Sequence, residues 1–436
     1  MKTAFVTMAL AATSAAAMQL SNDERATLAT EVLAWKATEA GKVAIEQGLA
    51  KPSSNQESLD VSDDEIIRFA ATKKIVDQLN IDHPEARFST NNPFVLLTEK
   101  EFAEYVKGSF ARGQPERRLR ADTVARDLTI EQAEAAGIDW SADKCNPSVK
   151  NQGNCGSCWT FSSVAVAEQA HCLATGSLLD LSEQQLVSCD SSSGEGCQGG
   201  WPWKALDYIS ANGICTEADY PYTSGSTGQN GQCKTSCRKT KLSIGSTVNI
   251  QGESALQSAL DKQAVQVIVE AGNNVWKNYQ SGVVKSCPGS QSDHAVLAVG
   301  YGTLSGVNHF KIKNSWGTSW GAGGYIYLQR GVGSNGMCNV AEHPSYPEIN
   351  TTPTPTSQDP TDGPTDSPSP STKTPSPTTK SPSPTTKTPV PTTKKPNKCH
   401  GCTGCYYPDG DECYNDYDAE SCQDLSWDYG TIWCGN

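Results

Sequence analysis

The number and placement of cysteines constrain this chain more than any other feature of its sequence. It has 17 cysteines in 436 residues and none before Cys145. Eleven lie from Cys145 to Cys338, and the other six lie from Cys399 to Cys434. If cysteines pair as disulfides, an odd total leaves at least one over, and we expect it among the eleven because six is even. The sequence therefore predicts two disulfide-bonded regions and one reactive thiol.

The first residues indicate that the chain is exported. Met1 and Lys2 precede a run of small and apolar residues that ends in three alanines at Ala17, which is the pattern of a secretory signal peptide cleaved after Ala17. The run is too short for a membrane anchor, and no later stretch is apolar enough to span a bilayer. Secretion leads to an oxidising compartment, where cysteines pair. We expect a secreted protein that does not bind membranes, with the lysosome or vacuole as the alternative location.

Composition divides the chain into further regions. A stretch without cysteine and rich in Ala, Glu, Lys and Arg precedes the first cysteine group, and a stretch of Thr, Pro, Ser and Lys that cannot bury a core separates the two groups. The sequon Asn350-Thr351-Thr352 predicts glycosylation at the start of the second stretch. We predict a signal peptide at 1–17, a helical prosegment at 18–133, a globular domain at 134–348, a linker at 349–397 and a small Cys-rich module at 398–436.

The pattern of the globular domain predicts two lobes. Helical patterns dominate its first half, in the run from Cys158, at 182–187 and at 201–209. β-Branched and aromatic segments bounded by glycines dominate its second half, at 265–269, 294–301, 309–313 and 325–328. Helices followed by strands predict an α+β fold, and a cleft between the two lobes would be the ligand site.

Cys158 is the candidate for the reactive thiol. It lies in the segment Gln152–Trp159, directly before an apolar run from Phe161 to Ala174 with helical spacing. The unpaired N–H groups and the macrodipole at a helix start favour negative charge, and the thiolate is the nucleophilic form of cysteine. The alternatives are an inert buried thiol and a cysteine that pairs between chains. The position at a helix start favours a catalytic nucleophile.

Three motifs in this order resemble those of papain-like cysteine peptidases. They are Cys155-Gly156-Ser157-Cys158-Trp159, Ser292-Asp293-His294-Ala295 and Lys313-Asn314-Ser315-Trp316-Gly317. The resemblance is to the cathepsin L-like group of this family. It implies a two-lobe fold with a helical lobe and a β-barrel-like lobe, and an endopeptidase made as a zymogen that cleaves proteins and peptides.

The resemblance also implies a role for each member of the site. Cys158 would attack the peptide carbonyl, His294 would hold the thiolate and protonate the leaving amine, and Asn314 would orient the imidazole. Gln152 would donate its side-chain amide to the oxyanion. Taken singly, these could instead be a core histidine, a turn residue and a loop residue. A zinc site is the other use of cysteine and histidine, but no paired histidines follow at zinc-finger spacing, so we expect no metal and no cofactor.

Disulfides and a substrate pocket are likewise implied by the resemblance, since spacing alone does not give connectivity. The implied pairs are Cys155–Cys197, Cys189–Cys233, Cys287–Cys338, Cys145–Cys172 and Cys215–Cys237. The implied substrate-binding residues are Gly200, Trp201, Pro202, Ser292, Ala295, Trp316, Trp320 and His343, with Glu342 as the alternative to His343 at the pocket base. The apolar rim favours a bulky apolar or aromatic side chain at the second residue before the cut.

The predicted prosegment carries partial versions of the family's motifs. Ser62-Asp63-Asp64-Glu65 predicts a capped helix start. Residues at the spacing of the family's helix motif are Phe69, Val76 and Asn80, and the departures from it are Glu65 and Thr72 in place of Arg and Asn. We expect this region to occupy the cleft until cleavage between residues 120 and 137 removes it, favoured at acidic pH where carboxylates lose charge.

The C-terminal module combines six cysteines with more aromatic rings than so small a fold can bury. The candidates for an exposed binding patch are Tyr406, Tyr407, Trp427, Tyr429 and Trp433. A catalytic domain, a linker and an aromatic Cys-rich unit in this order favour binding of a polysaccharide. The alternative for the module is a packing or protein-interaction unit, and the alternative for the whole chain is a non-catalytic, wall-associated binding protein with a vestigial peptidase domain.

The charge of the chain excludes one class of partner. Its net charge is −13 and its pI is near 5.0, and no basic stripe lies outside the lysine-bearing linker, so we expect no nucleic-acid partner. A soluble monomer that acts on proteins or peptides in an acidic or extracellular setting fits this composition.

Overall fold

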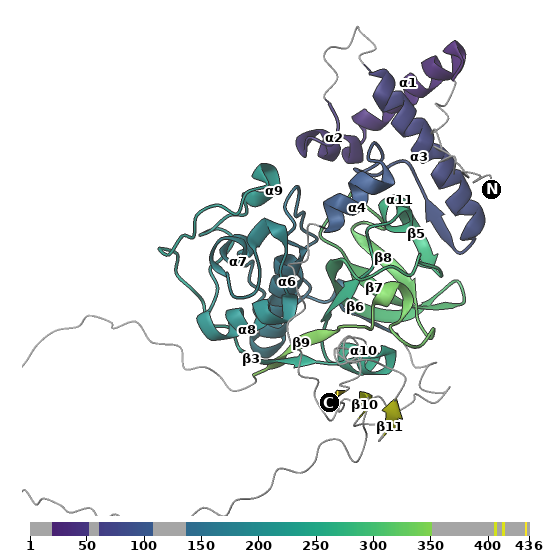
Figure 1. The fold of residues 1–436 in the computed structure, drawn as a ribbon. Helices are drawn as coiled ribbons and strands as arrows, with labels where there is room; N and C mark the ends of the chain where they lie inside the picture. The colour runs from purple at the N-terminus through teal and green to yellow at the C-terminus, as the bar shows by residue number, and fades with distance from the viewer. Residues whose placement is uncertain are drawn as a thin grey trace, which may run out of the picture. The chain divides into compact units, whose positions relative to one another are not determined.

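The computed structural model describes residues 20–51, 61–107 and 137–350, together with three short strands between residues 405 and 433. It contains two compact units, Met1–Gln358 and Asp359–Asn436, which are described separately (Figure 1). The predicted signal peptide and the linker beyond residue 350 lie outside the described residues. In the described part of the chain, no helix is long and apolar enough to cross a membrane.

Residues 20–51 and 61–107 form a helical N-terminal region. Its elements are α1 (Asn22–Ala37), α2 (Glu39–Glu46), α3 (Asp63–Asp82), β1 (Ala86–Phe88) and α4 (Glu99–Lys107). The predicted helix start at Ser62 is confirmed. The Ser62 hydroxyl accepts a hydrogen bond from the Glu65 N–H, and the Glu65 carboxylate accepts one from the Ser62 N–H at 3.0 Å. Buried side chains such as Val32 and Phe69 join α1 to α3.

The two departures from the family's helix motif have partners within this region. Glu65 forms a buried ion pair with Lys36 of α1 at 2.7 Å. The Thr72 hydroxyl donates to the Val95 carbonyl at 2.7 Å, which ties α3 to the segment before α4. Removal of one partner from a buried ion pair leaves a costly unpaired charge. Glu65 and Thr72 therefore stabilise the N-terminal region through contacts of their own.

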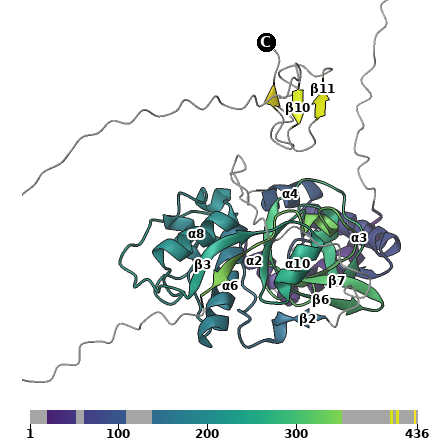
Figure 2. The same ribbon diagram turned by 90° about the horizontal axis from the view of Figure 1, so that it is seen from below.

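The first lobe of the globular part is helical, as predicted. Its elements are β2 (Ile138–Asp139), η2 (Trp140–Ala142), α6 (Cys158–Thr175), α7 (Glu183–Cys189), η3 (Gly196–Gln198), α8 (Pro202–Asn212) and α9 (Ser224–Thr227). Helix α6 is buried over most of its length, with Trp159, Val164 and Ala167 wholly inaccessible to solvent. It lies between α8 on one side and strand β6 on the other, which places the helix start where the lobes meet (Figure 2).

The second lobe is built on a nine-stranded sheet of order β1-β5-β8-β7-β6-β4-β9-β3, with β2 paired to β6. Its strands after β2 are β3 (Ile244–Asn249), β4 (Val265–Val269), β5 (Tyr279–Val284), β6 (His294–Leu304), β7 (Val307–Lys313), β8 (Tyr325–Gln329) and β9 (Ser345–Ile349). The connections carry α10 (Glu253–Leu260), α11 (Asn274–Asn278) and η4 (Met337–Asn339). The predicted α+β fold, with a helical lobe before a strand-rich lobe, is confirmed.

The N-terminal region supplies one edge of this sheet. Strand β1 pairs with β5, and Ala86 lies opposite Gly282. Gly282 has a φ of +79°, and a Cβ there would lie 2.2 Å from the carbonyl oxygen of Glu85. Glycine alone allows this conformation and approach without strain. The pairing attaches the N-terminal region to the second lobe by backbone hydrogen bonds.

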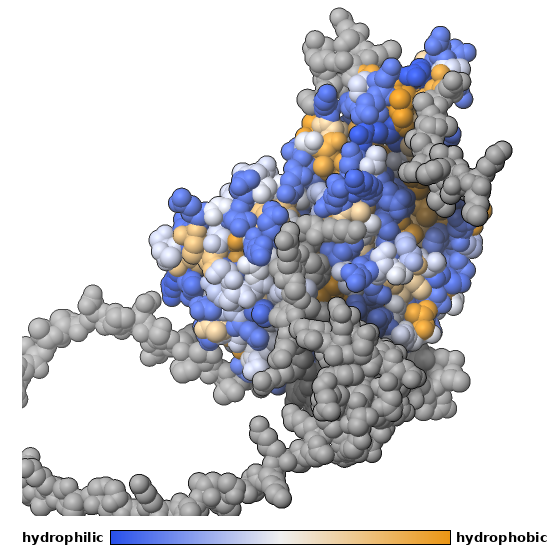
Figure 3. Space-filling view, in the orientation of Figure 1, coloured by the Kyte–Doolittle hydropathy of each residue, from blue (hydrophilic) through white to orange (hydrophobic). Residues whose placement is uncertain are grey.

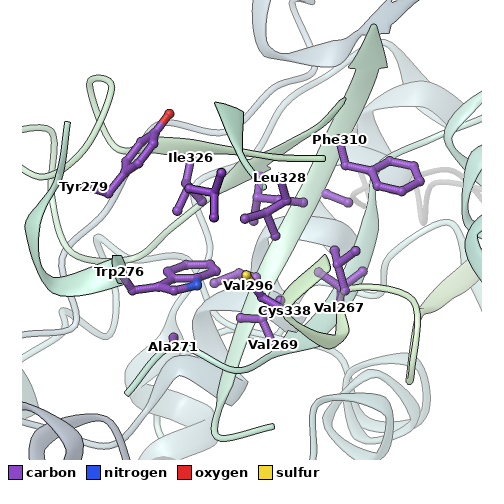
Figure 4. Close-up of a cluster of buried hydrophobic side chains, with 14 of the residues drawn as sticks. Val267, Val269, Ala271, Trp276, Tyr279, Val296, Phe310, Ile326, Leu328 and Cys338 are labelled. Atoms are coloured by element: carbon purple, nitrogen blue, oxygen red, sulfur yellow. The ribbon is translucent and has the colours of Figure 1, made fainter. Parts of the chain in front are cut away.

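The core of the second lobe is shared with the N-terminal region. Figure 4 shows Val267, Val269, Val296, Phe310, Ile326 and Leu328 projecting from the strands, with Trp276 and Tyr279 beside them. Phe94 and Phe102 of the N-terminal region belong to the same buried cluster. Burial of one such side chain contributes about 1.5–3 kcal/mol to folding, so these two rings contribute to the attachment of the N-terminal region.

Five disulfides stabilise the globular part. They join Cys145 to Cys172, Cys155 to Cys197, Cys189 to Cys233, Cys215 to Cys237 and Cys287 to Cys338. These are the pairs that the family resemblance implies. The Cys155–Cys197 bond fastens the loop before α6 to η3.

The second unit contains a small antiparallel sheet of order β11-β10-β12. Its strands are β10 (Cys405–Tyr407), β11 (Glu412–Tyr414) and β12 (Ile432–Trp433). The side chains of the predicted binding patch, from Tyr406 to Trp433, lie outside the described residues.

The face of the molecule seen in Figure 3 is mainly hydrophilic, with hydrophobic residues in small separate spots. Among the described residues, the exposed large hydrophobic side chains are Ile67, Ile81, Leu178, Leu304 and Val332. Ile67 and Ile81 both lie on α3, fourteen residues apart, and the other three lie elsewhere in the chain. Scattered side chains of this kind are ordinary on soluble proteins.

Candidate active site

Cys158 is the first residue of α6 and lies against the start of β6. Among the cysteines between residues 137 and 350 it is the one that forms no disulfide, and it is buried. Its Sγ accepts a hydrogen bond from the backbone N–H of Ala295 at 3.2 Å. A donor aimed at sulfur and the helix start both favour the thiolate over the thiol. The residue before Ala295 is His294, so the two lobes bring the predicted nucleophile and base together.

His294 and Asn314 form a direct hydrogen bond. The His294 Nε2 lies 2.7 Å from the Oδ1 of Asn314, and the same oxygen accepts the backbone N–H of Ser315 at 2.8 Å. An amide oxygen only accepts, so Nε2 must carry the ring hydrogen of a neutral imidazole. The Nδ1 has no hydrogen-bond partner among the described residues. The lone pair that can take a proton therefore lies on Nδ1.

Burial keeps this imidazole neutral in the structure. The His294 ring stacks on Trp316 at 4.7 Å and meets the edge of Trp276 at 6.4 Å, and its side chain has no exposed surface. Desolvation lowers the pKa of His294 to about 4, and the hydrogen bond with Asn314 opposes this shift. The site is therefore closed and uncharged at the histidine while the N-terminal region covers it.

Gln152 links the loop before α6 to the residue after Asn314. Its Nε2 donates to the carbonyl of Cys155 at 3.0 Å, and its Oε1 accepts the Ser315 hydroxyl at 2.7 Å. Its backbone N–H donates to the Ser315 carbonyl at 2.9 Å. A side-chain amide carries two hydrogens, so one remains for an oxyanion. The structure brings all four predicted catalytic residues into one connected group.

The N-terminal region covers this group. Phe94 and Phe102 meet the face of Trp316 edge-on, with ring centroids 5.3 and 5.5 Å away. The hydroxyl of Tyr105, on α4, donates to the Gly153 carbonyl at 2.7 Å. Burial raises the pKa of Tyr105, so the phenol stays protonated and keeps this hydrogen bond.

The predicted pocket residues form a second cluster beside the site. The Ser292 hydroxyl donates to a carboxylate oxygen of Glu342 at 2.5 Å, and the other oxygen lies 3.7 Å from the His343 Nε2. The rings of Trp201 and Trp203 lie 5.1 Å apart, and that of His343 lies 6.2 Å from Trp203. Pro202, at the first position of α8, and Ala295, at Cys158, are buried. Both Glu342 and His343 therefore belong to this cluster.

Two predicted substrate-binding tryptophans have no open surface in the structure. Trp316 lies under the N-terminal region and is 1% exposed. Trp320 is wholly buried, stacks on Trp276 at 5.9 Å and donates its Nε1–H to the Trp276 carbonyl. Trp320 also packs against Trp316, with ring centroids 4.9 Å apart, so it supports the tryptophan on which His294 stacks.

Packing requires glycine at position 200, and sequence analysis missed this requirement. A Cβ at this position would lie 2.4 Å from the indole of Trp159. The glycine therefore allows the loop after η3 to lie against the residue that follows the nucleophile. Sequence analysis also missed Ser315, since a serine beside an asparagine carries no signal of its contact with Gln152.

A group of charges near Asn314 also escaped prediction, and in it Glu168 and Glu183 are buried while Asp180 is exposed. Lys150 lies 2.8 Å from Asp180, 2.9 Å from Glu183 and 3.7 Å from Glu168. Burial raises the pKa of Glu168 and Glu183. A cavity of about 30 Å³ beside these residues is also lined by Asn314 and Ser315, and it has room for about one water.

The chain matches known proteins over both its N-terminal region and its globular part. Residues 135–348 match the papain family cysteine protease model. The chain is 35% identical over 321 residues to the cysteine proteinase COT44 of Brassica napus, which covers 70% of this chain and 93% of that protein. It is 38% identical over 291 residues to digestive cysteine proteinase 2 of Homarus americanus, covering 64% and 87%.

Solved structures with the same fold include precursor forms. The proform of the ragweed pollen allergen Amb a 11 has a TM-score of 0.62 at 29% identity, covering 76% of this chain and 98% of that one. Procathepsin L 3 from the larval midgut of Tenebrio molitor has a TM-score of 0.58 at 29% identity, covering 71% and 98%. These matches extend over the helical N-terminal region, as expected for a zymogen. This chain belongs to the papain family of cysteine proteases.

Proposed function

We propose that the protein is a secreted cysteine endopeptidase, made as a zymogen, that hydrolyses peptide bonds through Cys158, His294 and Asn314. The observation that supports this proposal is the hydrogen bond from the Ala295 N–H to the Cys158 sulfur at 3.2 Å, since Ala295 directly follows His294. The alternative, a binding protein with a vestigial peptidase domain, would be favoured by a missing catalytic residue. All four residues are present; His294 is hydrogen-bonded to Asn314, and Ser315 links Asn314 to Gln152.

The chemistry follows from the tautomer of His294. Its Nδ1 takes the thiol proton of Cys158, and the thiolate forms a bond to the carbonyl carbon of the substrate. The oxyanion accepts hydrogen bonds from the Gln152 amide and the backbone N–H of Cys158. The C–N bond then breaks as the imidazolium returns its proton to the leaving amine, and water hydrolyses the thioester. Asn314 keeps the ring oriented throughout because it accepts from Nε2.

The test has two parts. Turnover of a peptide by the activated wild-type enzyme is compared with turnover by a Cys158→Ala variant, and the residue alkylated by a thiol-directed epoxide is identified. Turnover that survives the substitution, or alkylation of a different cysteine, would reject the assignment of Cys158.

Substrate preference rests on the cluster at Trp201 and His343. Large rings line it, which supports a preference for a bulky apolar or aromatic side chain at the second residue before the cut. Its base also carries Glu342, whose carboxylate is bound to Ser292. Endopeptidase activity, which the resemblance to the cathepsin L-like group implies, is part of the proposal.

We propose that the N-terminal region inhibits the enzyme until it is cut off between residues 120 and 137. Its contacts support this: β1 extends the sheet, two phenylalanines cover Trp316, and Tyr105 holds the loop before α6. Lys277 of the second lobe is also buried beneath it and donates to Leu97 and Thr72. The segment that would be cut lies outside the described residues.

Acidic pH should loosen this region through Glu101. The Arg68 guanidinium at 2.5 Å and the Thr98 N–H at 2.8 Å lower the pKa of Glu101 from 4.5 to about 2. A lowered carboxylate pKa stabilises the folded region above pH 4.5, and that stability is lost as the pH falls from 4.5 to about 2. The side chain is 42% exposed, so solvent screens the pair.

Glu101→Gln should therefore speed removal of the N-terminal region by about two- to fivefold at weakly acidic pH. The difference from wild type should shrink as the pH falls towards 2, because the wild-type Glu101 carboxylate is then increasingly protonated and also loses its charge. The measurement is the cleavage rate of a Cys158→Ala zymogen by added mature enzyme across this range. Glu104→Gln is the control. Its carboxylate lies on the same helix, and its ion pair is a long one of 3.8 Å with the exposed Lys100 of that helix. A Glu101→Gln rate equal to wild type at every pH would contradict the role of Glu101.

We propose further that the second unit binds a polysaccharide. The support is the aromatic surplus of its sequence, because planar rings stack on sugar faces, and a linker raises the local substrate concentration around the anchor. The full chain should co-sediment with insoluble cellulose or chitin, and Trp427→Ala or Trp433→Ala should weaken this binding. If the chain stays in the supernatant with every polymer but co-purifies with a protein, the module is an interaction unit instead.

A further inference from the structure

The two proposed oxyanion donors lie at the ends of one irregular loop. Gln152 supplies a side-chain amide, and the peptide between Ser157 and Cys158 supplies a backbone N–H. Residues 152–157 form no helix or strand, so their positions depend on contacts from elsewhere. Such donors act only within a few tenths of an ångström of the right place. A residue that fixes both ends of this loop therefore fixes the positions of both oxyanion donors, and it should affect the rate of acyl transfer.

One hydroxyl contacts both ends. The hydroxyl of Tyr222 donates to the Gln152 carbonyl at 2.8 Å and lies 2.7 Å from the Ser157 Oγ. A carbonyl can only accept, so the single phenolic hydrogen goes to Gln152. The single Ser157 hydrogen has two acceptors within reach, and we assign it to the Tyr222 oxygen at 2.7 Å because the Cys155 carbonyl is farther away at 3.3 Å. The bonds run in one direction, from Ser157 through Tyr222 to Gln152.

The Ser157 side chain bonds to Tyr222 and does not cap the helix. It occupies the N-cap position of α6 but makes no side-chain hydrogen bond to the helix N–H groups, although serine at this position usually does. Its side chain is fully buried, and its other neighbour is the Cys155 carbonyl at 3.3 Å. The cap residue next to the nucleophile is thus held by a tyrosine far along the chain.

The Tyr222 ring is itself fixed in place. It meets Phe161 of α6 edge-on at 4.9 Å, and it packs against the cluster that contains the Cys155–Cys197 disulfide. Its backbone N–H donates to a Glu217 carboxylate oxygen at 2.7 Å. Burial raises the pKa of Tyr222, so the hydroxyl keeps its hydrogen at any working pH.

We propose that Tyr222 is a positioning residue for the oxyanion hole, which it serves by tying the Gln152 backbone to the peptide that carries the Cys158 N–H. This inference rests on the proposed function, because it assumes an oxyanion at these two donors. Tyr222 would not contact the substrate itself. Loss of the Tyr222 hydroxyl should therefore slow acyl transfer, and it should not slow reactions of the Cys158 thiol that form no oxyanion.

The test is Tyr222→Phe, which removes only the hydroxyl. We expect kcat for a peptide amide to fall about tenfold with KM nearly unchanged, since both donors remain but lose their tie. A peptide aldehyde, which forms a tetrahedral adduct on Cys158, should bind more weakly by a similar factor. Alkylation by iodoacetamide, which attacks an sp³ carbon, should keep its wild-type rate. Ser157→Ala should act alike, and the double variant should be no worse than either single one.

Tyr220→Phe is the matched control. Tyr220 is a buried tyrosine two residues away, and its hydroxyl donates to the Gln232 carbonyl at 2.8 Å, outside the loop. This variant should keep its wild-type kcat. An unchanged kcat in Tyr222→Phe, or an equal fall in hydrolysis and alkylation, would overturn the inference. Failure of the wild-type enzyme itself to hydrolyse peptides would instead reject the proposed function.

Discussion

Replacement of Cys158 by alanine should lower kcat for a peptide substrate by about six orders of magnitude, which is the scale of loss when a nucleophile is removed from a catalytic triad. The covalent route disappears because every other cysteine between residues 137 and 350 is held in a disulfide. The oxyanion donors and His294 would remain, so only slow water attack would be left. The measurement is the initial rate of fluorogenic peptide hydrolysis per mole of folded, processed enzyme.

Ser163→Ala is a suitable control for this change. Ser163 is another buried polar residue of α6, five residues along the helix from Cys158, and its hydroxyl lies within hydrogen-bond distance of the backbone carbonyls of Trp159 and Pro202. Its loss should reduce stability and leave kcat close to wild type. Equal losses of activity in the two variants would indicate that damage to α6, and not removal of a nucleophile, explains the Cys158→Ala result.

Replacement of Gln152 by alanine should lower kcat by about a hundred- to a thousandfold, because one of two oxyanion donors is lost. KM should change little, since the donor acts on charge that develops in the transition state. The substitution also removes the hydrogen bond between the Ser315 hydroxyl and the Gln152 side chain. Steady-state kinetics on enzyme whose active sites have been counted with an irreversible inhibitor measures the effect.

Gln263→Ala controls for the loss of a buried glutamine. Gln263 is 3% exposed, and its amide donates to the Pro347 carbonyl, away from Cys158. We expect a stability change there without a fall in kcat. A Gln152→Ala enzyme that kept kcat within a few-fold of wild type would show that the backbone N–H of Cys158 suffices, and the role assigned to the Gln152 side chain would be wrong.

The sequence predicted the local structure around the site better than its long-range contacts. The helix from Cys158, the cap at Ser62 and the strand from His294 follow from signals within a few neighbouring residues, namely periodicity and capping chemistry. These signals report which face of an element is buried and where it begins. The order of Gln152, Cys158, His294 and Asn314 added the chemistry through a family resemblance.

What the sequence did not reveal are contacts between distant segments. Tyr222 reaches the loop before α6, Ser315 reaches Gln152, and β1 pairs with β5. A single tyrosine or serine has the same local signal whether or not its hydroxyl finds such a partner. The need for glycine at position 200 also depends on a distant segment, since the indole that excludes a side chain there belongs to Trp159 of α6. Partner identity depends on how the lobes pack, which periodicity does not encode.

The most direct test of the account is the identity of the residue that carries the reactive thiolate. Mature wild-type enzyme is treated with one equivalent of a thiol-directed epoxide and digested, and the adduct is located by mass spectrometry. We predict one adduct per chain, on the peptide that contains Cys158, in step with the loss of peptide hydrolysis, and no adduct in Cys158→Ala. An adduct on any other cysteine, or full hydrolysis by enzyme alkylated at Cys158, would contradict the central claim.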